Sequence, residues 1–202
     1  MNAHPTALPA VDLFWIPLGS GGHSVRFNGK VYEALAARMA HRPRCDIFHT
    51  ALTVRVPDGL FTIEMTPIPD RKPWERGVVA EGAVGTRWAG RFRMFRYEVR
   101  RWRDGVVPDI GFAVASPIRL TEDEPIAQSI LELLPAVPTP VWGRDELGAG
   151  EMWSCNSIIS WALTRAGVDT EAIPLPPGGR APGWDAGISV AHRSQASPRI
   201  AA

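Results

Sequence analysis

The alternation of apolar and polar positions predicts a β-hairpin in the first half of the chain. Residues 47–56 and 60–66 are both rich in strand-forming residues, and the turn sequence Pro57-Asp58-Gly59 lies between them. Strand-like patterns are also present over residues 11–18, 91–103 and 113–120.

Helical spacing of apolar positions predicts three further elements. One helix is expected over residues 30–39, and a second begins at the acidic cap sequence 121–124 and ends before Pro135. A third covers residues 154–167, because Ser154 is suited to its N-cap and the glycine at its end is a natural stop.

The third predicted helix carries Cys155 in its first turn. Ile158, Ile159 and Ala162 follow at helical spacing and give this helix one apolar face. The N-terminus of a helix is its positive end, which lowers the pKa of a thiol there and makes it a better nucleophile when a base is near. Cysteine is also a small apolar residue that is often buried, so a structural role for Cys155 stays open.

The predicted hairpin places a histidine and a carboxylate on one face. If Arg55 lies opposite Leu60 across the turn, His49 and Glu64 are diagonal neighbours on that face. His49 could then serve as the base for the thiol, and Glu64 could orient its ring. Both residues could instead be structural, and a register shift of one residue would move Glu64 to the other face. His23 is the alternative base.

The composition is that of an ordinary globular protein. The 202 residues are 45% apolar and 21% charged, and the formal net charge of +1 gives no general attraction to nucleic acid. Residues 1–175 are expected to form one domain, and the proline- and glycine-rich residues 176–202 a partly disordered tail. Two cysteines, no leader sequence and no stretch of membrane-spanning length predict a cytoplasmic protein with free thiols.

One segment resembles the nucleophile helix of NlpC-type papain-like hydrolases. It reads Ser-Cys-Asn-Ser-Ile-Ile-Ser-Trp-Ala-Leu over residues 154–163 and Arg-Ala-Gly-Val over residues 165–168. The histidine precedes it, in Asp-Ile-Phe-His-Thr-Ala-Leu-Thr-Val over residues 46–54, and Phe-Thr-Ile-Glu follows at residues 61–64. This order is similar to that of the circularly permuted branch, which includes lecithin:retinol acyltransferase-like proteins.

The resemblance implies an α+β, papain-like fold in which an antiparallel sheet packs against the helix that carries the nucleophile. It implies that Cys155 is the nucleophile, that His49 is the general base and that Glu64 orients the histidine. Four residues close to the thiol in sequence are expected to contact the substrate, namely Trp142, Trp153, Ser154 and Asn156. No cofactor and no metal site are expected, because the histidines and cysteines lack the spacing of metal ligands.

These assignments predict a thiol hydrolase that cleaves an amide or isopeptide bond of a small or peptidic substrate through an acyl-enzyme on Cys155. The same fold would serve an acyltransferase or a thioesterase, and a non-catalytic protein would use the pocket for binding alone. A further alternative is binding of single-stranded nucleic acid through residues 87–103, where arginines alternate with aromatic residues. The near-neutral net charge argues against that alternative. The oligomeric state is not predicted.

Overall fold

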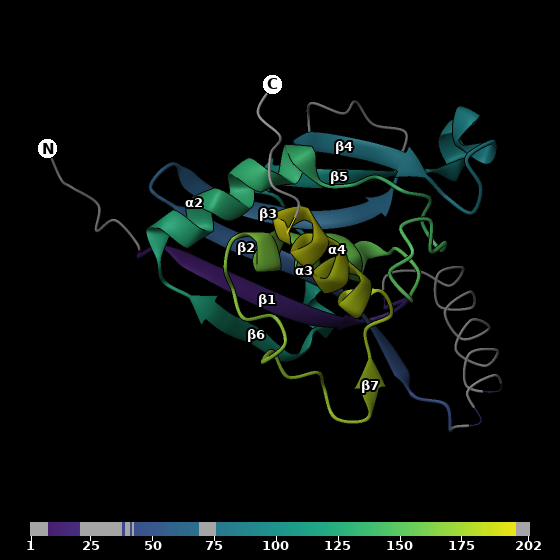
Figure 1. Cartoon of the computed structure of the whole chain (residues 1–202). Helices are drawn as coiled ribbons and strands as arrows, with labels where there is room; N and C mark the ends of the chain where they lie inside the picture. Colours follow the sequence, from purple (N-terminus) through teal and green to yellow (C-terminus); the bar gives the residue numbers. More distant parts are fainter. Residues whose placement is uncertain (1–7, 21–37, 39–40, 42, 69–75, 197–202) are drawn as a thin grey trace, which may run out of the picture.

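The computed structural model of the chain, drawn in Figure 1, describes residues 8–20, 38, 41, 43–68 and 76–196. These residues form an α+β structure around a seven-stranded sheet with the order β4-β5-β3-β2-β1-β6, and β7 lies beside β2. Neighbouring strands are antiparallel, except that the short β7 is parallel to β2. The strands are β1 (Ala10–Pro17), β2 (Asp46–Val56), β3 (Gly59–Pro67), β4 (Val78–Ala83), β5 (Arg96–Arg103), β6 (Val114–Thr121) and β7 (Gly179–Arg180).

Within the described residues, three α-helices accompany the sheet, and in Figure 1 all three lie in front of it. None of them has the length and the apolar character needed to cross a membrane. The α-helices are α2 (Glu124–Leu133), α3 (Cys155–Arg165) and α4 (Trp184–Ala196). Short 3-10 helices are η2 (Ala89–Arg91), η3 (Arg93–Phe95), η4 (Ile110–Phe112) and η5 (Leu134–Ala136).

One face of the sheet is apolar and packs against the helices. Side chains alternate along a strand, so every second residue points to this face, including Leu13 and Trp15 of β1 and Leu52 of β2. They share one buried cluster with Ile130 of α2 and Ile158 of α3. Removal of this apolar surface from water is the main stabilising contribution to the fold.

The opposite face of the sheet is more polar. It carries a small apolar cluster of Ile16, Ala51 and Val107. His49 points to this face, because its neighbours on both sides, Phe48 and Thr50, point toward the helices. The sheet therefore separates an apolar core from a region where charged side chains gather.

The structure confirms the predicted hairpin and its register, since Arg55 of β2 lies opposite Leu60 of β3. The two strands stay paired from the turn as far as Leu52 opposite Ile63. The predicted strands at 11–18 and 113–120 and the helix after the acidic cap correspond to β1, β6 and α2.

Two other predicted elements have different outcomes. The strand predicted over residues 91–103 begins only at Arg96, because residues 89–95 form η2 and η3. The alternation of apolar and polar residues changes phase near Met94 and Phe95, next to the residue where the extended backbone of β5 begins. The helix predicted over residues 30–39 lies outside the described residues, apart from Arg38.

The C-terminal segment differs from the predicted tail over residues 176–202. Residues 184–196 form α4, and Trp184, Ile188 and Ala191 belong to the same buried cluster as α3. Glycine lowers helix propensity and contributes no side chain to an apolar pattern, so this helix has a weak sequence signal. Residues 197–202 lie outside the described residues.

Candidate functional site

The N-terminus of α3 is held by a capping box, as the predicted N-cap requires. The Ser154 hydroxyl accepts a hydrogen bond from the amide of Asn156 at 3.1 Å, and the Ser154 amide donates to the Ser157 hydroxyl at 2.9 Å. The Ser154 hydroxyl also donates to the carbonyl oxygen of Pro182 at 2.7 Å. The hydrogen-bonding groups of Ser154 that were predicted to contact the substrate therefore bond to other residues of the protein.

Asn156 joins α3 to the sheet. Its amide nitrogen donates to the carbonyl oxygens of Phe48 at 3.0 Å and Pro182 at 2.9 Å, and its side-chain oxygen accepts from the Thr50 hydroxyl at 3.0 Å. Asn156 is buried. Because a buried polar group without partners is costly, this satisfied amide fixes the position of α3 against β2.

Cys155 lies between these polar residues and is itself buried. Burial raises the pKa of the Cys155 thiol to about 11, and backbone hydrogen bonds at Thr50 and Asn156 oppose this increase without cancelling it. The sulfur makes a weak contact of 3.9 Å with the side-chain oxygen of Asn156. Within the described residues, no histidine forms a hydrogen bond with Cys155, and the polar partner of its sulfur there is Asn156.

His49 has a different partner. Its Nε2 lies 3.0 Å from Oδ2 of Asp109, and the two side chains are 19% and 16% exposed. Although burial acts to raise the pKa of Asp109, the hydrogen bond and the attraction to His49 lower it overall. The structure therefore joins His49 to a carboxylate, as predicted, but the carboxylate is Asp109 and not Glu64. His23, the alternative base, lies outside the described residues.

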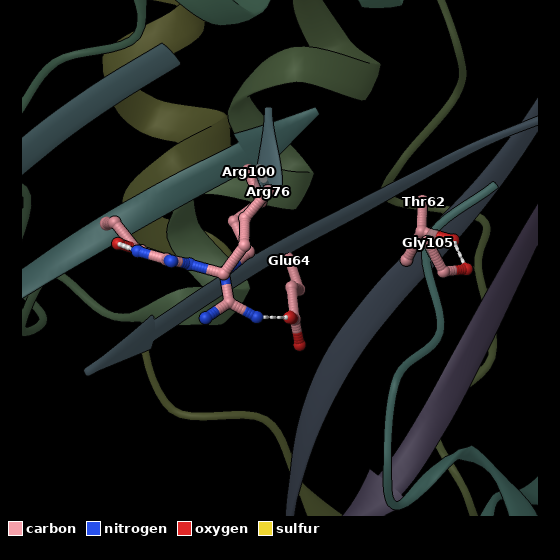
Figure 2. A network of polar contacts seen from close by, with 6 residues as sticks. Thr62, Glu64, Arg76, Arg100 and Gly105 are labelled. Atoms are coloured by element: carbon pink, nitrogen blue, oxygen red, sulfur yellow. Dashed lines mark hydrogen bonds and ion pairs between the residues drawn. The ribbon is translucent and has the colours of Figure 1, made fainter. Parts of the chain in front are cut away.

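Glu64 is on the same face as His49, as the register requires, but it pairs with Arg100. Nη1 of Arg100 donates to Oε1 of Glu64 at 2.5 Å, a contact that Figure 2 shows together with the bond from Thr62 to the carbonyl oxygen of Gly105. Burial raises the pKa of Glu64, and the nearby Arg100 only partly opposes this. The charges of Asp109 and His49 also act on Glu64, which places these groups in one electrostatic environment.

Arg100 belongs to a buried ion network that extends across β5. It donates to Oε1 of Glu98 at 2.6 Å, and Arg76 donates to both oxygens of the same carboxylate at 2.8 and 3.0 Å. Burial acts to raise the pKa of Glu98, but the hydrogen bonds from the two arginines lower it overall. Because Glu98 accepts from both sides, the guanidinium of Arg100 is held in a fixed position beside Glu64.

The two tryptophans predicted to contact the substrate, Trp142 and Trp153, lie with the apolar core and not beside His49. Trp153 is buried in the core, and its backbone pairs with Arg144 and Gly143. Trp142 is partly buried and packs edge-on against Tyr97, with 5.9 Å between the ring centroids. A shallow depression close to Trp142 is lined by Gly85, Thr86, Arg87, Val141, Arg144, Asp145 and Glu146.

The candidate functional site is therefore the cluster of His49, Asp109, Glu64 and Arg100 on the polar face of the sheet. Perturbed pKa values of groups that face one another are typical of functional sites. Asp109 and Arg100 were missed in the sequence. Two sequence signals could have found them. Asp109 is an acidic residue in the loop after the strand predicted over residues 91–103, and Arg100 lies on the same face of that strand as Glu98. Among the described residues, no group of three or more potential ligands could hold a metal ion.

Comparisons with known proteins add no further identification. No protein-family model matches the chain, and neither the curated proteins nor the solved structures yield a match to it.

Proposed function

We propose that the protein is a hydrolase of small amide or ester substrates, in which His49 is the general base and Cys155 is not the nucleophile. The observation that supports this proposal is the 3.0 Å contact between Nε2 of His49 and Asp109. A histidine oriented by a carboxylate is the common device for removing a proton at neutral pH. The resemblance to papain-like hydrolases also makes His49 a general base, but there its partner is the thiol of Cys155, whereas here it is a water molecule.

The contact with Asp109 fixes which nitrogen of His49 acts. The carboxylate of Asp109 has a lowered pKa and accepts a hydrogen bond, so the proton of the neutral imidazole lies on Nε2. Nδ1 then carries the lone pair. In the proposed step, Nδ1 takes a proton from a water molecule while the water oxygen attacks the substrate carbonyl carbon. The carbon–nitrogen or carbon–oxygen bond then breaks, and the leaving group takes up the proton from His49.

Glu64 and Arg100 have supporting roles in this proposal. Burial raises the pKa of Glu64, and Glu64 lies on the same face of the sheet as His49. Arg100 donates to Oε1 of Glu64, and the buried carboxylate of Glu98 holds Arg100 in place. This ion network would keep the polar groups beside His49 preorganised for the substrate.

A second candidate is a protein of the same kind that binds its ligand without cleaving it. The burial of Cys155 and the rise of its pKa to about 11 favour this candidate over a thiol hydrolase. In both candidates the ligand contacts the His49 cluster. They differ only in whether a bond in the ligand is broken.

A comparison of histidine and cysteine variants tests the proposal. The substrates are a panel of chromogenic esters and anilides with short acyl groups and amino acids. The variant His49→Ala should lower kcat/KM by roughly 100-fold or more, the usual contribution of a general base. The variant Cys155→Ala should stay within a few-fold of the wild type. The matched control is His192→Ala, because His192 is an exposed residue of α4, and its activity should be unchanged.

Each other outcome points to a different function. Loss of turnover in Cys155→Ala, with unchanged circular dichroism, would overturn the proposal in favour of a thiol nucleophile. Absence of turnover in the wild type across the whole panel would favour the binding protein. Equal losses in His49→Ala and His192→Ala would show that the activity does not arise at this site.

A further inference from the structure

The segment between β5 and β6 crosses the polar face of the sheet. In the sheet, β5 and β6 are separated by β3, β2 and β1, so residues 104–113 have to pass these three strands. Val107 belongs to the same buried cluster as Ile16 of β1. Farther along the segment, Asp109 contacts His49 of β2. We call residues 104–113 the crossing segment, and it carries the carboxylate of the candidate site to the strand of the histidine.

The crossing segment is bonded to β3 near its start. The Thr62 hydroxyl donates to the carbonyl oxygen of Gly105 at 2.7 Å, as Figure 2 shows. Thr62 lies opposite Thr53 of β2, and Thr53 and His49 are four residues apart in that strand, so Thr62 is on the same face as His49. Thr62 is only 2% exposed. A hydroxyl buried to this extent needs a partner within the protein, and the crossing segment supplies it.

The bond from Thr62 sets the direction of the chain at Gly105. The Gly105 amide donates to the carbonyl oxygen of Trp102 at 3.2 Å, and a β-carbon at Gly105 would lie 2.6 Å from the Trp102 ring. These contacts hold the start of the segment close to β5. The Thr62 hydroxyl adds a restraint on the carbonyl group of Gly105. Because a peptide unit is planar, the direction of this carbonyl also fixes the bond that leads to Val106.

The path from Gly105 to Asp109 is short and stiff. Three residues separate them, namely Val106, Val107 and Pro108. The ring of Pro108 fixes its own φ angle and restricts the residue before it to extended backbone. With so few free torsion angles between the two positions, a rotation of the Gly105 peptide would move the carboxylate of Asp109.

We infer that Thr62 is a positioning residue for the candidate site. Its hydroxyl orients the Gly105 peptide, and the crossing segment then brings Asp109 to 3.0 Å from Nε2 of His49. Without this donor the Gly105 carbonyl would lose its partner, and turning toward water would be favourable. The effect of Thr62 on turnover rests on the proposed function, whereas its effect on the contact between His49 and Asp109 does not.

Nuclear magnetic resonance of the His49 ring tests the inference without a substrate. The ring proton and carbon signals are assigned by comparison with His49→Ala, and Asp109→Asn shows where they lie when the carboxylate is lost. Thr62→Val keeps the shape of the side chain and removes the donor. It should move the His49 signals toward their positions in Asp109→Asn. Thr62→Ser keeps the hydroxyl and should give the signals of the wild type.

A second buried threonine provides the matched control. Thr170 is also 2% exposed, and its hydroxyl bonds to that of Thr164 of α3 at 2.7 Å. Thr170→Val therefore removes a similar hydrogen bond among the helices, and it should leave the His49 signals unchanged. The loss of one hydrogen bond is small beside the stability of an ordinary domain, so both valine variants should fold.

Turnover of the ester and anilide panel gives a second readout. Thr62→Val should lower kcat/KM by up to roughly 100-fold, the cost of a displaced catalytic group. It should add no further loss to Asp109→Asn, because both changes act through the same contact.

The inference is overturned if the His49 signals of Thr62→Val stay at their wild-type positions, or if Thr170→Val moves them equally. If they move as expected while the wild type shows no turnover, the positioning role is supported and the proposed function alone fails.

Discussion

A thiol in the first turn of a helix becomes a nucleophile only where its negative charge is stabilised. Cys155 occupies that turn, but it is buried, and its nearest polar groups are backbone amides and the side chains of Ser154 and Asn156. Desolvation therefore outweighs the favourable helix end. A pKa of about 11 keeps the Cys155 thiol protonated at neutral pH.

The free energy of unfolding should fall as the pH rises from about 9 to about 11 because of Cys155. The folded protein keeps the thiol protonated up to a pKa of about 11, whereas the unfolded chain ionises it near the ordinary value of 9.0. A raised folded pKa means that the stabilisation is complete below the unfolded pKa and is lost as the pH passes the folded one. The full loss corresponds to roughly 2–3 kcal/mol.

Urea unfolding at about pH 8 and about pH 10.5 measures this effect. Cys155→Ala should lack about 2 kcal/mol of the decline seen in the wild type between the two conditions. Cys45→Ser, which alters the other and less buried cysteine, should keep the decline. An equal decline in Cys155→Ala would contradict the assignment.

Single residues could be predicted where the signal was local. The cap at Ser154 and the register of Arg55 opposite Leu60 follow from a few neighbouring residues, and both are confirmed. The partner of His49 could not be predicted, because Asp109 lies 60 residues farther along the chain. Glu64 was on the correct face, but its choice of Arg100 depends on how β5 pairs with β3.

At the scale of elements, α3 and α4 meet through small residues and hydroxyl groups. The Ser157 hydroxyl donates to the carbonyl oxygen of Gly183, and the Ser160 hydroxyl donates to that of Trp184, both at 2.7 Å. A β-carbon added at Gly187 would lie 2.1 Å from the Ser160 oxygen and 2.2 Å from the Ser157 carbonyl oxygen. The helices are therefore as close as their backbones allow.

The variant Gly187→Ala should destabilise the protein. In an exposed helix, alanine is favoured over glycine by about 1 kcal/mol. Here the clash with a backbone oxygen outweighs that gain, so a net loss of about 2 kcal/mol or more is expected in urea unfolding. Gly111→Ala is the control, because a β-carbon there meets nothing within 4 Å, and it should change stability by less than about 0.5 kcal/mol. A Gly187→Ala protein as stable as the wild type would contradict the close packing.

The helices and strands that could be predicted best are those whose apolar residues recur at the most regular spacing. The hairpin and α2 have strong patterns and were predicted with nearly correct ends. By contrast, α4 contains a glycine and follows a segment rich in proline and glycine, so its sequence predicts a tail and not a helix. The apolar residues of α4 become buried because they pack against α3. This contact joins distant parts of the chain, so a local sequence pattern does not show it.

At the scale of the whole molecule, the last helix completes the core. Trp184, Ile188 and Val190 of α4 are buried in the cluster shared with the sheet and α3. Burial of each such side chain contributes roughly 2 kcal/mol, and the three together approach the total stability of an average domain. A chain that ends at residue 175 should therefore give no cooperative transition in thermal unfolding. A sharp transition near that of the full chain would show that α4 is dispensable.

The strand β5, which lies between β4 and β3, has a consequence for sequence design. Its residues Tyr97, Glu98, Val99 and Arg100 are buried on both sides, the odd positions among apolar groups and the even positions among charges. In most strands, the side chains on one face are exposed, and substitutions there are tolerated. At these four positions, a substitution enters either the apolar core or the buried ion network, so in a mutagenesis library this stretch should tolerate the fewest replacements.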